Sequence, residues 1–303
     1  MTSSGQSSTL ATATSASGAV TLWKRPLFFN TPSPEPERKL EAARRRLSRL
    51  LVRSNNNSSS EWDVAVMEEV QTQLDSNYFV LLDQFVGRSR GGSDGWMSEL
   101  KSEIKTLLPI STPTKGRVGS TGSGASAMAL RSDVAIWVQA GGQSRAIDAL
   151  THRVDGLVAS LRRHGRLDEL SGTTSRSDAM VAMYPPNGSH YVRHFDNICS
   201  GGHGKRCNGR RLTAVYYLGN GKDAEEAARV EEGFEPGALR IFWPGPPDSD
   251  ARVDVSPAPD RLCIFWSDER VPHAVLPTKR STRLAITHWF FDVDERERAE
   301  RKD

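Results

Sequence analysis

The sequence predicts a mostly β domain backed by helices (α+β), with its strands folded into a double-sheet jelly roll. Eight short apolar segments follow one another between residues 179 and 291, and turns rich in Gly and Pro separate them. Helical periodicity is found mainly before residue 178. The length of 303 residues and the hydrophobic fraction of 37% suffice for one large domain with a substantial core.

The first 61 residues are predicted to precede the folded domain. Residues 1–37 are rich in Ser, Thr, Ala and Pro, with no acidic residue before Glu35, which is typical of a disordered tail. Residues 38–61 combine a basic amphipathic helix with a Ser/Asn-rich linker. We expect that helix to pack loosely on the domain, with contact to a membrane or a partner as the alternative. The folded domain is therefore expected over residues 62–303.

Within the domain, we expect helical support over residues 62–178, a jelly-roll core over residues 179–292 and a charged C-terminal helix over residues 293–303. Apolar periodicity predicts helices over residues 62–74, 93–107 and 147–161. The expected strands are 78–82, 134–138, 179–184, 191–196, 211–218, 238–242, 252–255, 261–266, 273–276 and 283–291.

A Gly/Ser/Thr-rich stretch separates Pro109 from Leu130. The spacing of Gly119, Gly122 and Gly124 resembles a phosphate-binding loop, but no strand leads into it and no Lys-Ser/Thr pair follows. That interpretation is rejected. A stretch of this length inside a compact domain is usually a functional lid or disordered, and we expect one of the two here.

Three residues in the strand-rich half form a candidate metal site. His194 and Asp196 stand two apart in a β-prone run, so on a strand both side chains would point to one face. Together with His273 they would supply two imidazoles and one carboxylate, which leaves the opposite positions of an iron ion open, as an O₂-activating Fe(II) centre requires. Arg283 offers a planar fork of donors suited to a carboxylate. The alternative for the His194 and Asp196 pair is an ordinary surface or core histidine. The alternative for Arg283 is a surface salt bridge.

The chain resembles the hypoxia-inducible-factor prolyl hydroxylases, the prolyl 4-hydroxylase branch of the Fe(II)/2-oxoglutarate dioxygenases. The resemblance covers about residues 62 to 300 and is nearly continuous from residue 180 onward. It is carried by the segments Met180–Gly188, Tyr191–Asn197, Leu239–Phe242, Asp260–Leu262, Phe265–Asp268 and Ala285–Asp292.

This resemblance implies a double-stranded β-helix, the cupin-like form of the jelly roll, with the metal site in its open mouth. It also implies Fe(II), 2-oxoglutarate and O₂ as cofactors and cosubstrates, with ascorbate as reductant. The implied reaction is hydroxylation of proline at C4 in a protein or peptide substrate, as a peptidyl-proline 4-dioxygenase. Oxygen sensing in a hypoxia response is the associated role, although sequence does not report the O₂ affinity that such a role needs.

The resemblance also assigns roles around the triad. Arg283 would pair with the distal carboxylate of 2-oxoglutarate, assisted by Tyr217 and Thr287, and Tyr184 would lie near the iron-side end. Arg211 would contact the substrate, with pairing to an acidic neighbour as the alternative. The loop after Pro109 would cover the substrate and be held by Arg131 and Asp133. The residues that would line the pocket, for which core packing is an equal explanation, are Met180, Val215, Leu239 and Trp289.

The balance of charge and the apolar runs restrict the partners. A net charge of +3, without an evident basic-aromatic groove, argues against nucleic acid. No apolar run approaches the length of a membrane span. We expect a monomer in the cytoplasm, with the nucleus as an alternative. An organelle transit peptide is disfavoured because only Lys24 and Arg25 supply early positive charge.

The three cysteines form an odd, sparse set that suits a reducing compartment. Cys199, His203 and Cys207 share one Gly-rich insertion, but their spacing matches no closed zinc pattern, so we expect a loop with unpaired thiols. This insertion enlarges a loop beside the candidate metal site. It therefore leaves the identity of the substrate open.

Two other functions remain open from sequence. One is a dioxygenase of the same fold that oxidises another side chain, a nucleic acid or a small molecule. The other is a non-catalytic jelly-roll module that binds a metal or ligand. The complete triad and Arg283 argue against the second, and the long lid favours an extended peptide over a small molecule.

Overall fold

The computed structural model describes residues 34–56, 62–87, 93–108, 114–115, 130–142, 144–164, 167–198, 207–219, 236–242, 252–279 and 281–301. All of them belong to one compact unit, Thr31–Asp303. Most of the tail predicted over residues 1–37 and most of the linker lie outside the described residues. Among the described helices, none has both the length and the apolar character needed to cross a membrane.

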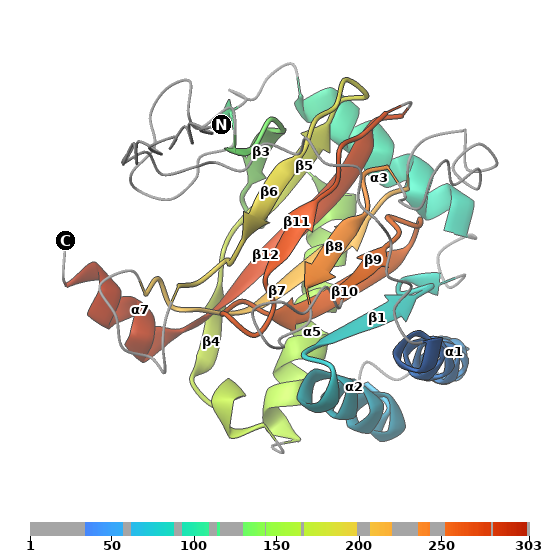
Figure 1. Ribbon diagram of the computed structural model, residues 1–303, viewed down its shortest axis with the longest axis vertical. Helices are drawn as coiled ribbons and strands as arrows, with labels where there is room; N and C mark the ends of the chain where they lie inside the picture. The colour runs from blue at the N-terminus through green and yellow to red at the C-terminus, as the bar shows by residue number, and fades with distance from the viewer. Residues whose placement is uncertain are drawn as a thin grey trace, which may run out of the picture. The chain divides into compact units, whose positions relative to one another are not determined.

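Two antiparallel sheets form the core of the fold (Figure 1). The larger, eight-stranded sheet has the order β1-β10-β7-β12-β5-β3-β2, with β4 also paired to β12, and the smaller has the order β6-β11-β8-β9. This is the predicted jelly roll. The strands are β1 Phe79–Asp83, β2 Thr114–Lys115, β3 Val134–Val138, β4 Thr173–Arg176, β5 Ala179–Tyr184, β6 Tyr191–His194, β7 Arg210–Tyr217, β8 Leu239–Phe242, β9 Arg252–Val255, β10 Arg261–Trp266, β11 His273–Val275 and β12 Arg283–Asp292.

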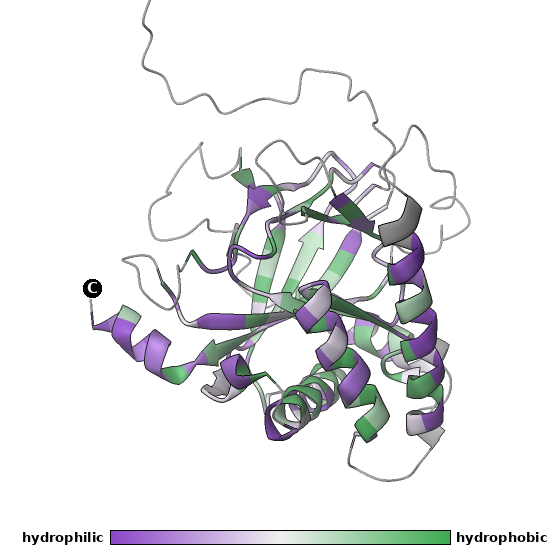
Figure 2. Ribbon diagram, turned by 60° about the horizontal axis from the view of Figure 1, so that its bottom comes forward, coloured by the Kyte–Doolittle hydropathy of each residue, from purple (hydrophilic) through white to green (hydrophobic). Residues whose placement is uncertain are grey.

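Helices support the larger sheet, and Figure 2 shows apolar (green) and polar (purple) residues alternating along them, as in amphipathic helices. The alternation of β12 shows how the layers are arranged, because His288 turns outward and lies 3.0 Å from the hydroxyl of Thr151 on α5. The residues on either side of His288, Thr287 and Trp289, turn inward toward the smaller sheet. The helices are α1 Pro34–Asn56, α2 Val64–Ser76, α3 Ser93–Leu107, α5 Arg145–Arg163 and α7 Val293–Glu300, with a 3₁₀ turn at Asp168–Leu170.

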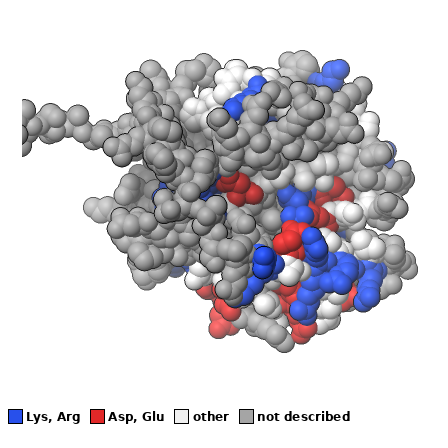
Figure 3. All heavy atoms as spheres, turned by 45° about the vertical axis from the view of Figure 1, so that its right-hand side comes forward, with Lys and Arg blue, Asp and Glu red and all other residues white. Residues whose placement is uncertain are grey.

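Helix α1 begins at Pro34, four residues before the predicted start, since proline is well tolerated in the first turn of a helix. Its apolar face is part of the core, with Leu47 and Leu51 buried. Arg44 pairs with Asp83 at 2.8 Å, which ties the helix to β1. The opposite face is exposed and basic, and Figure 3 shows Lys and Arg side chains gathered on this side of the molecule.

Two strands were not predicted, β2 and β4. β4 has the polar sequence Thr-Thr-Ser-Arg and exists because it pairs with the C-terminal end of β12. β2 has only two residues, and it pairs with β3. Both strands depend on a partner that is distant in sequence, so local propensity does not reveal them. The rest of the predicted lid lies outside the described residues.

Candidate metal centre and guanidinium cluster

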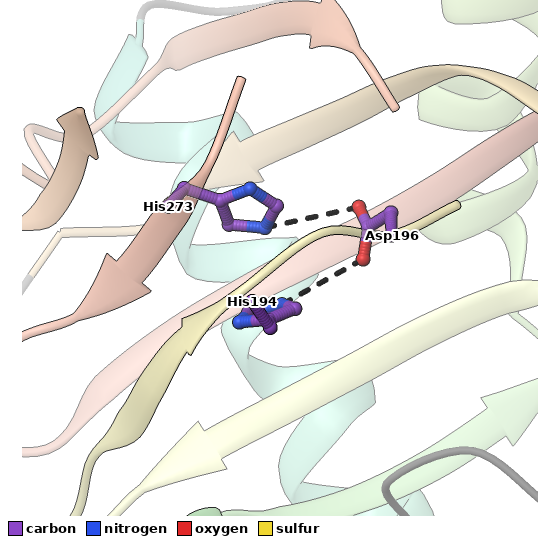
Figure 4. Close-up of side chains that lie close together, drawn as sticks. All are labelled: His194, Asp196 and His273. Carbon is purple, nitrogen blue, oxygen red and sulfur yellow. Dashed lines mark ion pairs between the residues drawn. The ribbon is translucent and has the colours of Figure 1, made fainter. Parts of the chain in front are cut away.

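The three predicted metal ligands meet between the two sheets. His273 on β11 is directly opposite His194 on β6, so the imidazoles lie side by side, with ring centroids 4.2 Å apart. Asp196 follows the end of β6, and its carboxylate oxygens lie 3.7 Å from Nε2 of His194 and 3.9 Å from Nε2 of His273 (Figure 4). One ligand atom from each residue lies within 4.8 Å of the others. This spacing allows all three to contact one ion.

The sequence predicts Asp196 on the same strand as His194, but the structure places it after the end of β6. β6 ends at His194 because the backbone carbonyl of Asp196 turns toward a different partner, the side-chain amide of Asn208, at 2.8 Å. The carboxylate therefore reaches the histidines from a bend and not by strand alternation. The predicted proximity is correct, but its geometric reason is not.

Hydrogen bonds fix the two imidazoles in the form that a metal needs. Nδ1 of His194 lies 2.8 Å from the carbonyl of Val192, and Nδ1 of His273 lies 2.9 Å from the carbonyl of Val271. A carbonyl only accepts, so each Nδ1 carries a proton and each Nε2 keeps its lone pair free. Burial and the neighbouring His273 hold the pKa of His194 well below its usual value. The ring is therefore neutral at pH 7.

Asp196 is ionised at neutral pH. Burial alone would raise its pKa, but His273, His194 and Arg210 together with the hydrogen bond from Thr213 outweigh burial, and the pKa is lowered. Two imidazoles that present Nε2 and one carboxylate are a donor set that fits a divalent iron ion with open positions. The residues present therefore fit the metal.

A second group, the guanidinium cluster, consists of Arg283, Tyr184 and Tyr217. The Arg283 guanidinium lies 4.8 Å from the ring centroid of Tyr184 and 5.1 Å from that of Tyr217, and only 3% of Arg283 is exposed. No carboxylate of the described residues pairs with it, its Nε has no hydrogen-bond partner, and the Tyr217 hydroxyl has only the Arg283 guanidinium beside it. The Nε of Arg211 is also without a partner, but that guanidinium is paired with two carboxylates, whereas Arg283 is not. A buried guanidinium without a carboxylate indicates a site for a carboxylate ligand.

Burial keeps the two tyrosines as neutral donors. It raises the pKa of Tyr217 and of Tyr184, and in both cases Arg283 opposes the effect without cancelling it. Each hydroxyl therefore retains its proton at neutral pH. Arg283 only donates, so the Tyr217 hydroxyl can accept from it and still keep its own proton for a ligand. The cluster can therefore offer a ligand one cation and one hydroxyl donor.

The other residues predicted to line the pocket lie on the inward faces of their strands. On β12, alternation places Thr287 and Trp289 on the same face as Arg283, and Thr287 is opposite both Met180 and Val215. On β8, Leu239 turns inward from the smaller sheet. All are buried, with at most 7% exposed. They therefore belong to the buried layer that the two sheets enclose.

Arg131 and Asp133 connect the end of the predicted lid to the triad. The two form a bidentate ion pair with both contacts at 2.6 Å, and both residues are buried. The Arg131 guanidinium lies 4.5 Å over the ring of Tyr191, which in turn stacks on His194 at 3.6 Å. The pair thus supports a metal ligand through Tyr191, a residue that sequence reasoning did not single out.

Arg211 lies away from the triad. Its guanidinium contacts Glu295 at 2.8 Å and Asp292 at 3.2 Å, so the acidic pairing left open by the sequence is the arrangement observed. Arg210 instead approaches the site, with Nη1 3.9 Å from Asp196 and its guanidinium 4.1 Å over the ring of Trp289.

A shift in strand register explains this exchange. Strict alternation from Tyr217 would turn Arg211 inward, but the pairing of β7 with β12 shifts between Phe290 and Phe291. Such a bulge changes which face the following residues occupy. A single sequence carries no reliable signal for a bulge. The sequence alone therefore does not predict that Arg210, and not Arg211, turns toward the triad.

The structure describes two of the three cysteines, Cys207 and Cys263. Cys199 and His203 of the disfavoured zinc alternative lie outside the described residues. Cys207 is disulfide-bonded, so the expectation of an unpaired thiol is wrong at this position. Cys263 is free and buried on β10.

The chain matches known proteins over most of the described domain. Residues 179–291 match the model of the 2OG-Fe(II) oxygenase superfamily. The chain is 36% identical over 227 residues to mouse prolyl hydroxylase EGLN3, covering 74% of this chain and 82% of that protein. It is 33% identical over 245 residues to rat Egl nine homolog 1, covering 78% of this chain and 62% of the rat protein.

A solved structure is similar along nearly its whole length. It is a prolyl hydroxylase from Trichoplax adhaerens in complex with a peptide fragment of a hypoxia-inducible factor, with a TM-score of 0.59 and 28% identity. The match covers 89% of this chain and 98% of that one. Against the Egl nine homolog 1 proteins of rat and mouse, in contrast, the chain spans only 62% and 52% of the length. The chain belongs to the 2OG-Fe(II) oxygenase superfamily and, within it, to the family of the Egl nine prolyl hydroxylases.

Proposed function

We propose that this protein is an Fe(II)- and 2-oxoglutarate-dependent dioxygenase that hydroxylates proline at C4 in a protein substrate. The observation that carries the proposal is the combination of two sites in one interior. The fold holds a complete set of iron ligands and also a buried arginine that has no carboxylate partner among the described residues. A binding module for a metal alone would not need the second site.

In this proposal each group of residues has a separate task. His194, Asp196 and His273 hold the iron, which supplies the activation of O₂ when bound. Arg283 pairs with the distal carboxylate of 2-oxoglutarate and Tyr217 donates a hydrogen bond to it, with Thr287 on the same strand face in support. Tyr184 and the apolar lining exclude water. Ascorbate acts as the external reductant.

The proposed reaction consumes 2-oxoglutarate and O₂ together. One oxygen atom is incorporated into succinate as CO₂ leaves, and the other enters the C4–H bond of the prolyl residue. The protein's share is to orient the two substrates and to keep the centre dry. Uncoupled turnover of 2-oxoglutarate in the absence of peptide would give succinate and CO₂ without a hydroxylated product.

A proline-containing peptide is the substrate that the site favours. The related Trichoplax enzyme was solved with such a peptide. In this chain, Trp137 on β3 remains 46% exposed while its ring lies 5.8 Å from that of Trp289, so an aromatic surface reaches from the inner lining to solvent. Arg210 lies over the ring of Trp289 and would contact the peptide, in place of Arg211. A role in oxygen-dependent signalling is part of this proposal.

We place the protein in the cytoplasm, with the nucleus as an alternative. The disulfide at Cys207 runs against a reducing compartment, because such compartments keep thiols reduced. The redox state of Cys207 in cells therefore tests this assignment directly.

The decisive experiment is mass spectrometry of host-cell extract incubated with the full chain, Fe(II) and 2-oxoglutarate under air. We expect one added oxygen atom on proline residues of a small set of proteins, with succinate formed in proportion. The matched control is the Arg283→Ala protein at the same 2-oxoglutarate concentration, which should lose both products. Oxidation confined to other residue types, or no succinate from a protein that retains iron, would overturn the proposal.

A further inference from the structure

The carboxylate of Asp196 is held by a short chain of hydroxyl groups. Thr213 Oγ1 lies 2.6 Å from Oδ2 of Asp196, and the hydroxyl of Ser267 lies 2.8 Å from Thr213 Oγ1. Thr213 is 1% exposed and Ser267 is fully buried. We propose that Thr213, oriented by Ser267, is a positioning residue that fixes the Asp196 carboxylate, so that Oδ1 stays turned toward His194 and Oδ2 toward His273.

The direction of both hydrogen bonds follows from the donors available. An ionised carboxylate only accepts, so the Thr213 hydroxyl must donate its single proton to Oδ2. Thr213 then has only lone pairs left for Ser267, and Ser267 must be the donor. The chain therefore runs one way, from Ser267 through Thr213 to Asp196. Hydrogen bonds to an ionised group are about twice as strong as neutral ones, which makes the last contact the dominant one.

Backbone contacts keep this chain rigid. Thr213 lies on β7 directly opposite Phe265 on β10, and Ser267 follows the end of β10. The Ser267 N–H donates to the carbonyl of Arg211 at 3.0 Å, and the Ser267 carbonyl accepts from the N–H of Asn197 at 2.8 Å. The bend that carries Asp196 is thus attached to the same residue that orients Thr213.

The consequence concerns the orientation of Asp196 before a metal binds. Oδ1 lies 3.7 Å from Nε2 of His194, and Oδ2, which also accepts from Thr213, lies 3.9 Å from Nε2 of His273. Each carboxylate oxygen has two lone pairs, so the bond from Thr213 fixes the plane of the carboxylate and still leaves both oxygens able to face an ion. The ligand atoms are therefore arranged in advance. This inference rests on the proposed metal site and deepens it.

The test measures binding of Mn²⁺ alone to metal-free protein, with no 2-oxoglutarate and no turnover. Thr213→Val keeps the shape of the side chain and removes its hydroxyl, and we expect Mn²⁺ affinity to fall by roughly 10- to 100-fold, the range seen when a partner of a metal ligand is lost. Thr213→Ser restores the hydroxyl and should restore the affinity. Ser267→Ala should give a smaller loss in the same direction, since Thr213 can still donate to Asp196.

A matched control separates positioning from general destabilisation. Thr151 is also a buried threonine, at 2% exposed, and its hydroxyl also bonds a polar side chain, but that partner is His288 on the outward face of β12. Thr151→Val should therefore lower thermal stability about as much as Thr213→Val while leaving Mn²⁺ affinity unchanged. Equal Mn²⁺ affinity in the wild type and Thr213→Val, or an equal loss in both valine variants, would refute the proposal. Failure of the wild type to bind Mn²⁺ would instead refute the proposed function.

Discussion

The metal triad and the guanidinium cluster differ in how their polar atoms are satisfied. The triad is held by hydrogen bonds inside the protein. Partners are present for Nδ1 of both histidines, for Oδ2 of Asp196 and for the hydroxyl of Thr213. The Nε2 atoms of both histidines are left to hold an ion. At the guanidinium cluster, the Nε of Arg283 has no partner, and the hydroxyl of Tyr217 has only Arg283 beside it, which cannot accept its proton.

This difference indicates what each site is built to receive. A single small ion needs ligand atoms that are fixed in advance, and the internal hydrogen bonds at the triad supply that order. A larger anionic ligand needs donors that nothing else occupies, and the cluster leaves Arg283 and Tyr217 in that state. The cost of these buried, unpartnered groups is compensated only when a ligand binds, so the cluster is predicted to discriminate strongly for a carboxylate.

The largest effect is expected when the triad itself is broken. His273→Ala should abolish Mn²⁺ retention and succinate formation together, because the remaining two ligands cannot hold the ion, and the loss should exceed the roughly 10- to 100-fold typical of losing an outer partner. A Mn²⁺ titration of the metal-free protein measures it. His152→Ala, an exposed histidine on α5, is the control and should change nothing. Undiminished succinate production by the His273 variant would end the metal assignment.

Arg283 and Arg211 provide the sharpest contrast between a functional and a structural arginine. Arg283→Ala should weaken 2-oxoglutarate binding by about 1.5 to 3 kcal/mol, or roughly 10- to 150-fold, while leaving Mn²⁺ affinity intact. Arg211→Ala removes a partner from Asp292 and Glu295, so it should lower stability without changing 2-oxoglutarate affinity. Calorimetric titration and thermal unfolding of both variants check this. Similar changes in 2-oxoglutarate affinity would show that the comparison is wrong.

His288, on the outward face of β12, should make stability depend on pH without affecting the site. Burial, with a contribution from Arg176, lowers its pKa from 6.5 to about 3. As pH falls below 6.5 the unfolded chain takes up a proton that the folded protein refuses, so stability decreases down to about pH 3, by at most ~1.4 kcal/mol per pH unit. Above pH 6.5 neither state binds the proton, and the contribution is complete.

His288→Gln removes this titrating group and can still bond Thr151. The stability of the wild type relative to this variant should therefore fall steadily as pH falls from 6.5 toward 3, measured by urea unfolding at several pH values. His152→Gln, exposed on α5, should leave the pH dependence of the wild type unchanged. Parallel stability curves for the wild type and His288→Gln would contradict the assignment of a neutral, buried imidazole.

The smallest effect separates two neighbouring tyrosines. Tyr217→Phe should weaken 2-oxoglutarate binding by about 0.5 to 1.5 kcal/mol with little change in stability, because no residue accepts its hydroxyl proton without the ligand. The hydroxyl of Tyr216 points to the other face and donates to Asp260 at 2.9 Å. Tyr216→Phe should therefore lower stability and leave 2-oxoglutarate affinity unchanged. The reverse pattern would place the ligand elsewhere.

The sequence by itself determined the elements with strong local patterns and the types of residue at the site. The strands Val134–Val138, Ala179–Tyr184, Arg252–Val255 and Arg261–Trp266 occupy the predicted residues. Their apolar runs are long enough that local pattern and tertiary environment agree. The triad was found because few chemistries need two imidazoles and one carboxylate beside an arginine.

Only the tertiary structure decided how these residues meet. The pairing of β6 with β11 brings His194 to His273, the bend after β6 turns Asp196 inward, and the register shift in β7 exchanges Arg210 for Arg211. The role of Thr213 follows only from the tertiary structure, which places its hydroxyl 2.6 Å from Oδ2 of Asp196. Strand pairing, bulges and hydroxyl contacts join residues that are distant in the chain, and no local pattern encodes a distance between them.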